Sequence, residues 1–176
     1  VVLEELLRRA DELGVREVIL LNYLDGELDR VDVTEASEKI ANHIRRVQPH
    51  VVITFDPYGA YGHPDHIAIS QLTAAAIMRA ADAHRVSKLY YFVHGERKWA
   101  AYQAAFKKLT ASVDGTLRAA TAWPDWSITT AVDARDVWQT VWGAVQCHTT
   151  QMSIYKNVAE LTEEDQKVMW GTGEFY

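Results

Sequence analysis

Two imidazoles, two carboxylates and two tyrosines gather within one short segment of the 176-residue sequence. They are Asp56, Tyr58, Tyr61, His63, Asp65 and His66. Neutral imidazole nitrogens and carboxylate oxygens are the usual protein ligands of catalytic zinc, which keeps one coordination position open for water. The residue types therefore indicate a candidate site for metal chemistry.

Pro64 places the two histidines at the start of a helix. Proline suits the first helical position, so His63 is expected near the N-cap and His66 in the first turn. Because His63 precedes the helix, the two imidazoles need not bind one metal ion. The alternative is purely structural: His63 caps the helix, His66 packs under a loop and Asp65 complements the helix dipole.

The segment also lies in a favourable place for a site. Residues 51–55 are apolar and β-branched, which predicts a strand, and Asp56-Pro57 ends it. Open α/β sheets bind ligands at the carboxyl ends of their strands. The candidate residues are therefore expected at the ligand-binding edge of a sheet.

Helices and short apolar strands alternate along the chain. Strands are predicted at 18–21, 51–55, 89–93 and 128–132. Helices are predicted at 2–13, 33–47, 64–83, 99–109 and 133–148, with Asp32, Asp133 and, for a last short helix, Thr162 as N-cap candidates. This alternation predicts one α/β domain over residues 1–176, with a mainly parallel, doubly wound sheet.

The composition excludes several classes of protein. A formal net charge of −6 argues against a nucleic-acid partner. No apolar run approaches the roughly 20 residues that span a bilayer, so no transmembrane segment is expected. The single cysteine, Cys147, cannot form an internal disulfide, and the N-terminus lacks the pattern of a signal peptide. A cytoplasmic location is the expectation.

Residues 51–71, VVITFDPYGAYGHPDHIAISQ, closely resemble the second signature of the PIG-L/LmbE family of zinc-dependent N-deacetylases. This family includes enzymes of mycothiol, bacillithiol and GPI-anchor synthesis. The resemblance extends to the loop Tyr-Leu-Asp-Gly at 23–26 and to Cys-His-Thr-Thr-Gln at 147–151. It implies a three-layer, Rossmann-like fold and hydrolysis of the N-acetyl group of an N-acetylglucosamine-like sugar conjugate.

The resemblance also implies a role for each residue of the segment. His66 corresponds to a zinc ligand, and His63 to the residue that stabilises the tetrahedral intermediate or protonates the departing amine. Asp65 then orients His63, and Tyr61 hydrogen-bonds the acyl oxyanion. Amide hydrolysis needs each of these functions.

Contacts to the sugar substrate are expected from Asp25, Tyr58 and His148. Asp25 corresponds to a family residue that meets sugar hydroxyls, although an ordinary Asp-Gly turn would explain it equally well. His148 lies on an apolar helix face, so a packed core histidine is the alternative to a supporting role near the pocket. Trp123 and Trp126 could stack on a sugar ring or pack in the core.

The first family signature, Ala-His-Pro-Asp-Asp-Glu, is absent from this sequence. Of the three expected zinc ligands only His66 is present, and one imidazole does not hold catalytic zinc. We therefore expect an N-terminally incomplete domain that lacks the first strand and helix, exposes a sheet edge or core face, is inactive alone and could form a homo-oligomer.

The alternative function belongs to a different class: a catalytically incomplete relative that binds a sugar or a partner chain. The sequence holds no Gly-x-Ser-x-Gly nucleophile motif, phosphate-binding loop or dinucleotide-binding fingerprint, so other enzyme classes are less well supported.

Overall fold

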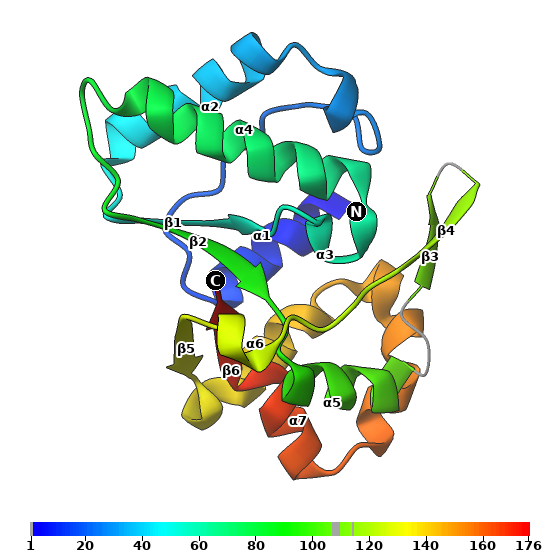
Figure 1. The fold of residues 1–176 in the computed structure, drawn as a ribbon. Coiled ribbons are helices and arrows are strands. Elements are labelled where there is room, and N and C mark those ends of the chain that lie inside the picture. The colour runs from blue at the N-terminus through cyan, green and yellow to red at the C-terminus, as the bar shows by residue number, and fades with distance from the viewer. Residues whose placement is uncertain (1, 107–109, 114) are drawn as a thin grey trace. The chain divides into compact units, whose positions relative to one another are not determined.

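The computed structural model describes residues 2–106, 110–113 and 115–176, and they form an α/β fold. The contacts divide the chain into two compact units (Figure 1). The first unit comprises residues 1–20, 94–109 and 124–174, and the second comprises residues 21–93, 110–123 and 175–176. Among the described residues, no helix has the length and apolar character needed to cross a bilayer. The prediction of a single domain stays a prediction.

The second unit is built on two parallel strands, β1 (Val51–Phe55) and β2 (Lys88–Val93), in register from Val51 opposite Lys88 to Phe55 opposite Phe92. Helices α2 (Val33–Val47) and α4 (Pro64–Ala80) lie side by side, and α4 packs on β1 (Figure 1). Their buried contact is made of small and branched residues: Ala41, Ile44, Ala76 and Ala80. Both strands and both helices were predicted.

The predicted N-cap Asp32 is confirmed in the second unit. Asp32 Oδ1 accepts a hydrogen bond from the Glu35 backbone amide at 2.8 Å, which satisfies a free N–H group at the start of α2. Gln48 adopts a left-handed conformation with φ 52° and ends α2 one residue before Pro49. The short 3-10 helix η1 (Leu28–Arg30) precedes α2.

The predicted strand at 18–21 is wrong, because these residues form no regular secondary structure. A strand needs a neighbour to hydrogen-bond with, and a short apolar run by itself does not supply one. Ile19 and Leu20 are exposed rather than buried on two faces.

The antiparallel hairpin of β3 (Thr110–Val113) and β4 (Thr116–Ala119) in the second unit was not predicted. The sequence does carry a hairpin signal there, the dipeptide Asp114-Gly115. The flanking segments Thr110–Val113 and Thr116–Ala119 also alternate polar and apolar residues, so the sequence contained the signal for this hairpin.

Helices dominate the first unit: α1 (Val2–Glu12), α5 (Glu96–Phe106), α6 (Trp138–Gln146) and α7 (Glu163–Trp170). The remaining elements are η2 (Asp125–Ser127), β5 (Thr130–Asp133), η3 (Arg135–Val137), η4 (Thr149–Glu160) and β6 (Thr172–Phe175), whose last residue belongs to the second unit. The buried core gathers Ala101, Ala105, Trp138, Val158, Met169 and Trp170. The helix predicted at 99–109 corresponds to α5, which starts earlier, at Glu96. Residues 107–109 of that prediction lie outside the described residues.

Two N-cap predictions in the first unit have different outcomes. Thr162 does cap α7, since its hydroxyl accepts from the Asp165 amide at 3.2 Å. Asp133 does not cap α6, because it ends β5 and its carboxylate accepts from the Arg135 amide and guanidinium instead. These hydrogen bonds lower the pKa of Asp133 to about 2.

Glu5 anchors α1 within the first unit. Its side chain is 1% exposed, and its carboxylate accepts from the hydroxyls of Thr149 at 2.5 Å and Thr150 at 2.8 Å and from the Thr150 amide at 3.1 Å. A buried carboxylate is tolerated when hydrogen bonds replace its lost hydration. The hydrogen bonds from Thr149, then those from Thr150, hold the pKa of Glu5 below its ordinary value.

We predict that Glu5→Gln destabilises the chain at neutral pH, because the amide offers one acceptor oxygen in place of two. A lowered folded-state pKa contributes stability above the ordinary glutamate pKa, and this stability is lost as pH falls through the lower folded value. The difference between Glu5→Gln and wild type in urea denaturation should therefore shrink on acidification. The exposed Glu12→Gln serves as control, and a pH-independent difference would contradict the assignment.

Candidate active site

The loop between β1 and α4 carries the candidate residues and is tied down by Asp56. The Asp56 side chain is 2% exposed. Its Oδ1 accepts from the Ala60 amide and its Oδ2 from Trp123 Nε1, both at 2.7 Å. Both carboxylate oxygens are therefore occupied by structural contacts, and Trp123 is held at the loop by its indole N–H.

The short helix α3 (Gly59–Gly62) turns the chain sharply before α4, and Gly59 is essential to that turn. Gly59 has φ +68°, and a Cβ atom there would lie 2.8 Å from Ile67 Cγ1 and 2.9 Å from the Ile67 backbone nitrogen. Only glycine meets both demands without displacing the backbone of α4.

His63 and His66 lie together with a ring-centroid distance of 4.7 Å. His63 is the N-cap of α4, and its Nδ1 accepts from the Asp65 backbone amide at 3.2 Å. A nitrogen that accepts carries no proton, so the neutral His63 ring holds its proton on Nε2. The predicted N-cap role is therefore present, and it leaves Nε2–H as a donor.

His66 adopts the opposite tautomer. Its Nδ1 contacts the Gly59 carbonyl at 3.3 Å, and a carbonyl can only accept, so Nδ1 carries the proton and Nε2 keeps a lone pair. Phe55 stacks on the ring at a centroid distance of 3.9 Å. Burial, then the proximity of His63, lowers the pKa of His66 and favours the neutral, ligand-competent ring.

The Asp65 carboxylate holds a distant loop. Oδ2 accepts from the Gly26 amide at 2.7 Å, and Oδ1 accepts from the Leu28 amide at 3.0 Å. Asp65 contacts His63 through its backbone amide rather than through its carboxylate. The orienting contact predicted between the Asp65 carboxylate and His63 is therefore not seen among the described residues, and the carboxylate positions the loop that carries Asp25 instead.

Tyr61 lies edge-on to both histidines, with ring-centroid distances of 5.8 Å to His63 and 5.4 Å to His66. Burial, followed by the negative charge of Asp25, raises the pKa of Tyr61, so its hydroxyl stays protonated at neutral pH. Four of the predicted site residues therefore come together: Tyr61, His63, Asp65 and His66.

Tyr58 and Asp25 occupy the border of this group. The Tyr58 side chain is half-exposed, and its hydroxyl donates to the Ala119 carbonyl of β4 at 3.3 Å. Asp25 is exposed in the loop that Asp65 holds. Their predicted contacts to a sugar stay predictions.

His148 belongs to the first unit. Its Nε2 contacts Arg9 Nη1 at 3.1 Å, and its Nδ1 lies 4.0 Å from Glu5 Oε2. These polar partners fit a core histidine whose hydrogen-bonding groups are satisfied, so that alternative stays open. Trp126 is 87% exposed, so core packing is excluded for this tryptophan. Neither observation tests a substrate contact.

Comparison with known proteins shows which families and relatives this chain resembles. Residues 2–77 match the family described as "PIG-L: GlcNAc-PI de-N-acetylase". Relatives named 1D-myo-inositol 2-acetamido-2-deoxy-alpha-D-glucopyranoside deacetylase match from Nocardiopsis dassonvillei, at 33% identity over 70% of this chain and 47% of the relative, and from Segniliparus rotundus, at 37% identity over 73% and 44%. This chain belongs to the PIG-L/LmbE deacetylase family.

A solved structure supports the fold of this PIG-L/LmbE chain. The conserved protein TT1542 from Thermus thermophilus superimposes with a TM-score of 0.64 at 21% identity, over 98% of this chain and 70% of that protein. The chain spans less than half the length of the deacetylases it matches.

The described residues of the PIG-L/LmbE chain include one imidazole suited to a metal ion. His66 has the tautomer and the backbone support of a metal-ligating imidazole. Within residues 2–106, 110–113 and 115–176, however, no group of three or more His, Cys, Asp or Glu side chains is arranged to hold a metal ion. Asp56 and Asp65 already use both carboxylate oxygens elsewhere. These residues alone do not fit a catalytic zinc centre.

Arg118 of β4 was missed by the sequence reasoning. Its Nη1 donates to the Gly62 carbonyl, immediately before His63. No local pattern signals this role, because Arg118 is 56 residues away from Gly62 in the sequence and reaches it only through the hairpin.

We predict that Asp65→Asn loosens the loop at 24–28 in this PIG-L/LmbE chain. The amide retains one acceptor for two backbone N–H groups and lacks the charge that strengthens both hydrogen bonds, so local opening should become easier by about 1–2 kcal/mol. Hydrogen exchange at the Gly26 and Leu28 amides measures this. Asp82→Asn, at an exposed carboxylate in the same unit, should leave both rates unchanged; equal effects of the two variants would refute the clamp.

Proposed function

We propose that the protein containing this chain hydrolyses the N-acetyl group of an N-acetylglucosamine-like sugar conjugate. The observation that carries the proposal is the pair of complementary tautomers at His63 and His66 beside the Tyr61 hydroxyl. The relatives support the substrate class, since their names specify a 2-acetamido-2-deoxyglucopyranoside linked to inositol.

The reaction adds the oxygen of water to the acetamide carbonyl carbon and breaks the C–N bond. The carbonyl oxygen becomes an oxyanion in the tetrahedral intermediate, and the departing nitrogen must gain a proton before it leaves as an amine. Acetate is the second product. An oxyanion donor and a proton donor are therefore the two functions that side chains must supply.

Tyr61 and His63 suit these two functions. The raised pKa of Tyr61 keeps its O–H available to donate to an oxyanion. His63 presents Nε2–H because its Nδ1 is occupied by the Asp65 amide, so this ring can donate toward the acyl oxygen or the departing nitrogen. His63 is fixed as the N-cap of α4, and Tyr61 lies edge-on to its ring.

We expect zinc to be the metal of the complete enzyme. The chemistry that zinc would supply there, if bound, is activation of a water molecule and polarisation of the acyl oxygen. Among the described residues, His66 Nε2 is the nitrogen suited to it, and the remaining ligands must come from outside them. The 176 residues by themselves are expected to bind zinc weakly and to be inactive.

A non-catalytic role is the second candidate. The incomplete donor set among the described residues favours it. In that case the exposed Asp25 and the half-exposed Tyr58 would bind a sugar without hydrolysing it.

The test is zinc content together with amine release from N-acetylglucosaminyl-inositol, using the intact gene product that contains these residues. We predict about one zinc per chain and measurable turnover. His66→Ala should lose both, whereas Tyr61→Phe should keep zinc and lower kcat by about a hundredfold, because one oxyanion donor is lost.

His50→Ala, at an exposed histidine of the same unit, is the matched control and should retain zinc and turnover. Absence of zinc and turnover in the intact product, with retained sugar binding, would favour the non-catalytic candidate. Full activity in His66→Ala would refute the assignment of the site.

A further inference from the structure

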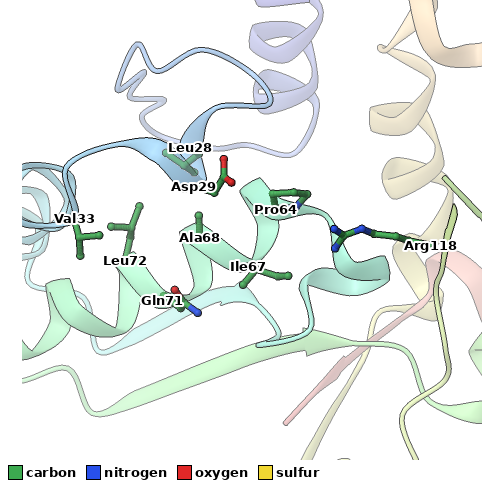
Figure 2. A pocket seen from close by; sticks show the side chains of 9 residues that line it. All are labelled: Leu28, Asp29, Val33, Pro64, Ile67, Ala68, Gln71, Leu72 and Arg118. Carbon is green, nitrogen blue, oxygen red and sulfur yellow. The ribbon is translucent and has the colours of Figure 1, made fainter. Parts of the chain in front are cut away.

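A pocket of about 380 Å³ lies in the second unit beside the first turns of α4 (Figure 2). Its walls are mainly apolar and come from Leu28, Val33, Ile67, Ala68 and Leu72. None of these side chains has a part in the proposed reaction. The volume falls near the lower end of the range for small-molecule sites, roughly 300–1,000 Å³. The pocket therefore has the size and lining of a site for a small, largely apolar molecule.

Arg118 closes one end of the pocket (Figure 2). Its Nη1 is used by the Gly62 carbonyl, but its Nε is buried and has no hydrogen-bond acceptor among the described residues. An unsatisfied buried donor on a charged group is costly, and an ordered water molecule, an ion or a ligand can supply the acceptor that it lacks. Arg118 Nε–H therefore lacks an acceptor oxygen among the described residues. Because Arg118 lines the pocket, a molecule bound there is a candidate to supply that oxygen.

The other polar groups of the pocket limit the charge of the ligand. Asp29 is exposed and lies 4.0 Å from Arg30 Nε, so it has its own cation. Gln71 is exposed and neutral. Among the described lining residues, Arg118 is therefore the cation with a donor, Nε–H, that lacks an acceptor. Its positive charge would balance one negative charge on a ligand.

We propose that this pocket binds a small amphiphilic monoanion, whose anionic oxygen accepts from Arg118 Nε–H and whose apolar body lies along Ile67, Ala68 and Leu72. A carboxylate is the simplest such head group, because a planar guanidinium N–H donates well to a carboxylate oxygen. The apolar body gains from the removal of its surface and that of the pocket walls from water.

The pocket is connected to the loop of the candidate active site through one residue. Arg118 also holds the Gly62 carbonyl, and Gly62 immediately precedes the N-cap residue His63. A ligand on Nε would therefore fix the guanidinium that supports this turn. The proposal does not depend on deacetylation, because binding can be measured without any turnover.

Octanoate is the probe, and NMR titration of the isotopically labelled intact gene product is the measurement. We expect saturable shifts in the backbone amides of Ile67, Ala68, Leu72 and Gly62. Acetate, which has the head without the body, and octanol, which has the body without the head, should each bind at least tenfold more weakly. Equal affinity for octanol would overturn the role of the anion, and shifts spread evenly over the chain would overturn the site.

Arg118→Lys keeps the positive charge and removes Nε–H, and it should weaken octanoate binding about tenfold. The Arg118→Lys change also alters the hydrogen bond to the Gly62 carbonyl. A second variant, at the exposed Gln71, therefore tests the pocket while leaving that hydrogen bond intact. Gln71→Glu adds a negative charge to the wall and should weaken octanoate binding at least fivefold, whereas octanol binding should change little.

Two matched controls place the same chemical changes elsewhere: Arg85→Lys and Gln103→Glu, both at exposed positions. Each should bind octanoate as the wild type does. Unchanged affinity in Arg118→Lys and Gln71→Glu, or equal losses in the controls, would refute the pocket as the binding site.

Discussion

The carboxylate of Asp65 is the constraint on which the candidate site depends. It accepts from two backbone amides, Gly26 and Leu28, that lie 39 and 37 residues earlier in the chain. The backbone amide of the same residue donates to His63 Nδ1. One residue in the first turn of α4 therefore sets both the position of the loop carrying Asp25 and the tautomer of His63. Charge-assisted hydrogen bonds of this kind are stronger than neutral ones, which suits a residue with two positioning tasks.

The two histidines acquire different chemistry from their different backbone partners. His63 meets an amide donor and His66 meets a carbonyl acceptor, so one ring presents a proton and the other a lone pair. The sharp turn at Gly59 makes this possible, because it brings the Gly59 carbonyl back to a ring seven residues later. A larger residue at position 59 would collide with Ile67, so the tautomer of His66 depends on a glycine that has no chemistry of its own.

Each unit supplies its own core, and polar anchors at the ends of helices complete it. In the first unit, Trp138 and Trp170 share one buried cluster with Met169, and the buried Glu5 anchors α1. In the second unit, small residues let α2 and α4 approach closely. Arg118 adds a further anchor there, from a hairpin to the Gly62 turn, and leaves one donor over for a ligand.

The sequence by itself determined the strand at 51–55, the helices that flank it and the residues of the active-site loop, because local periodicity, caps and a specific motif encode them. It did not show that residues 18–21 form no strand, because strand pairing depends on a neighbouring strand rather than on the apolar run itself. Nor did it reveal the clamp from Asp65 to Gly26, the contact of Asp56 with Trp123 or the reach of Arg118 to Gly62. Only the tertiary structure decided these, because each joins residues tens of positions apart, and a hydrogen bond across that separation leaves no trace in local spacing.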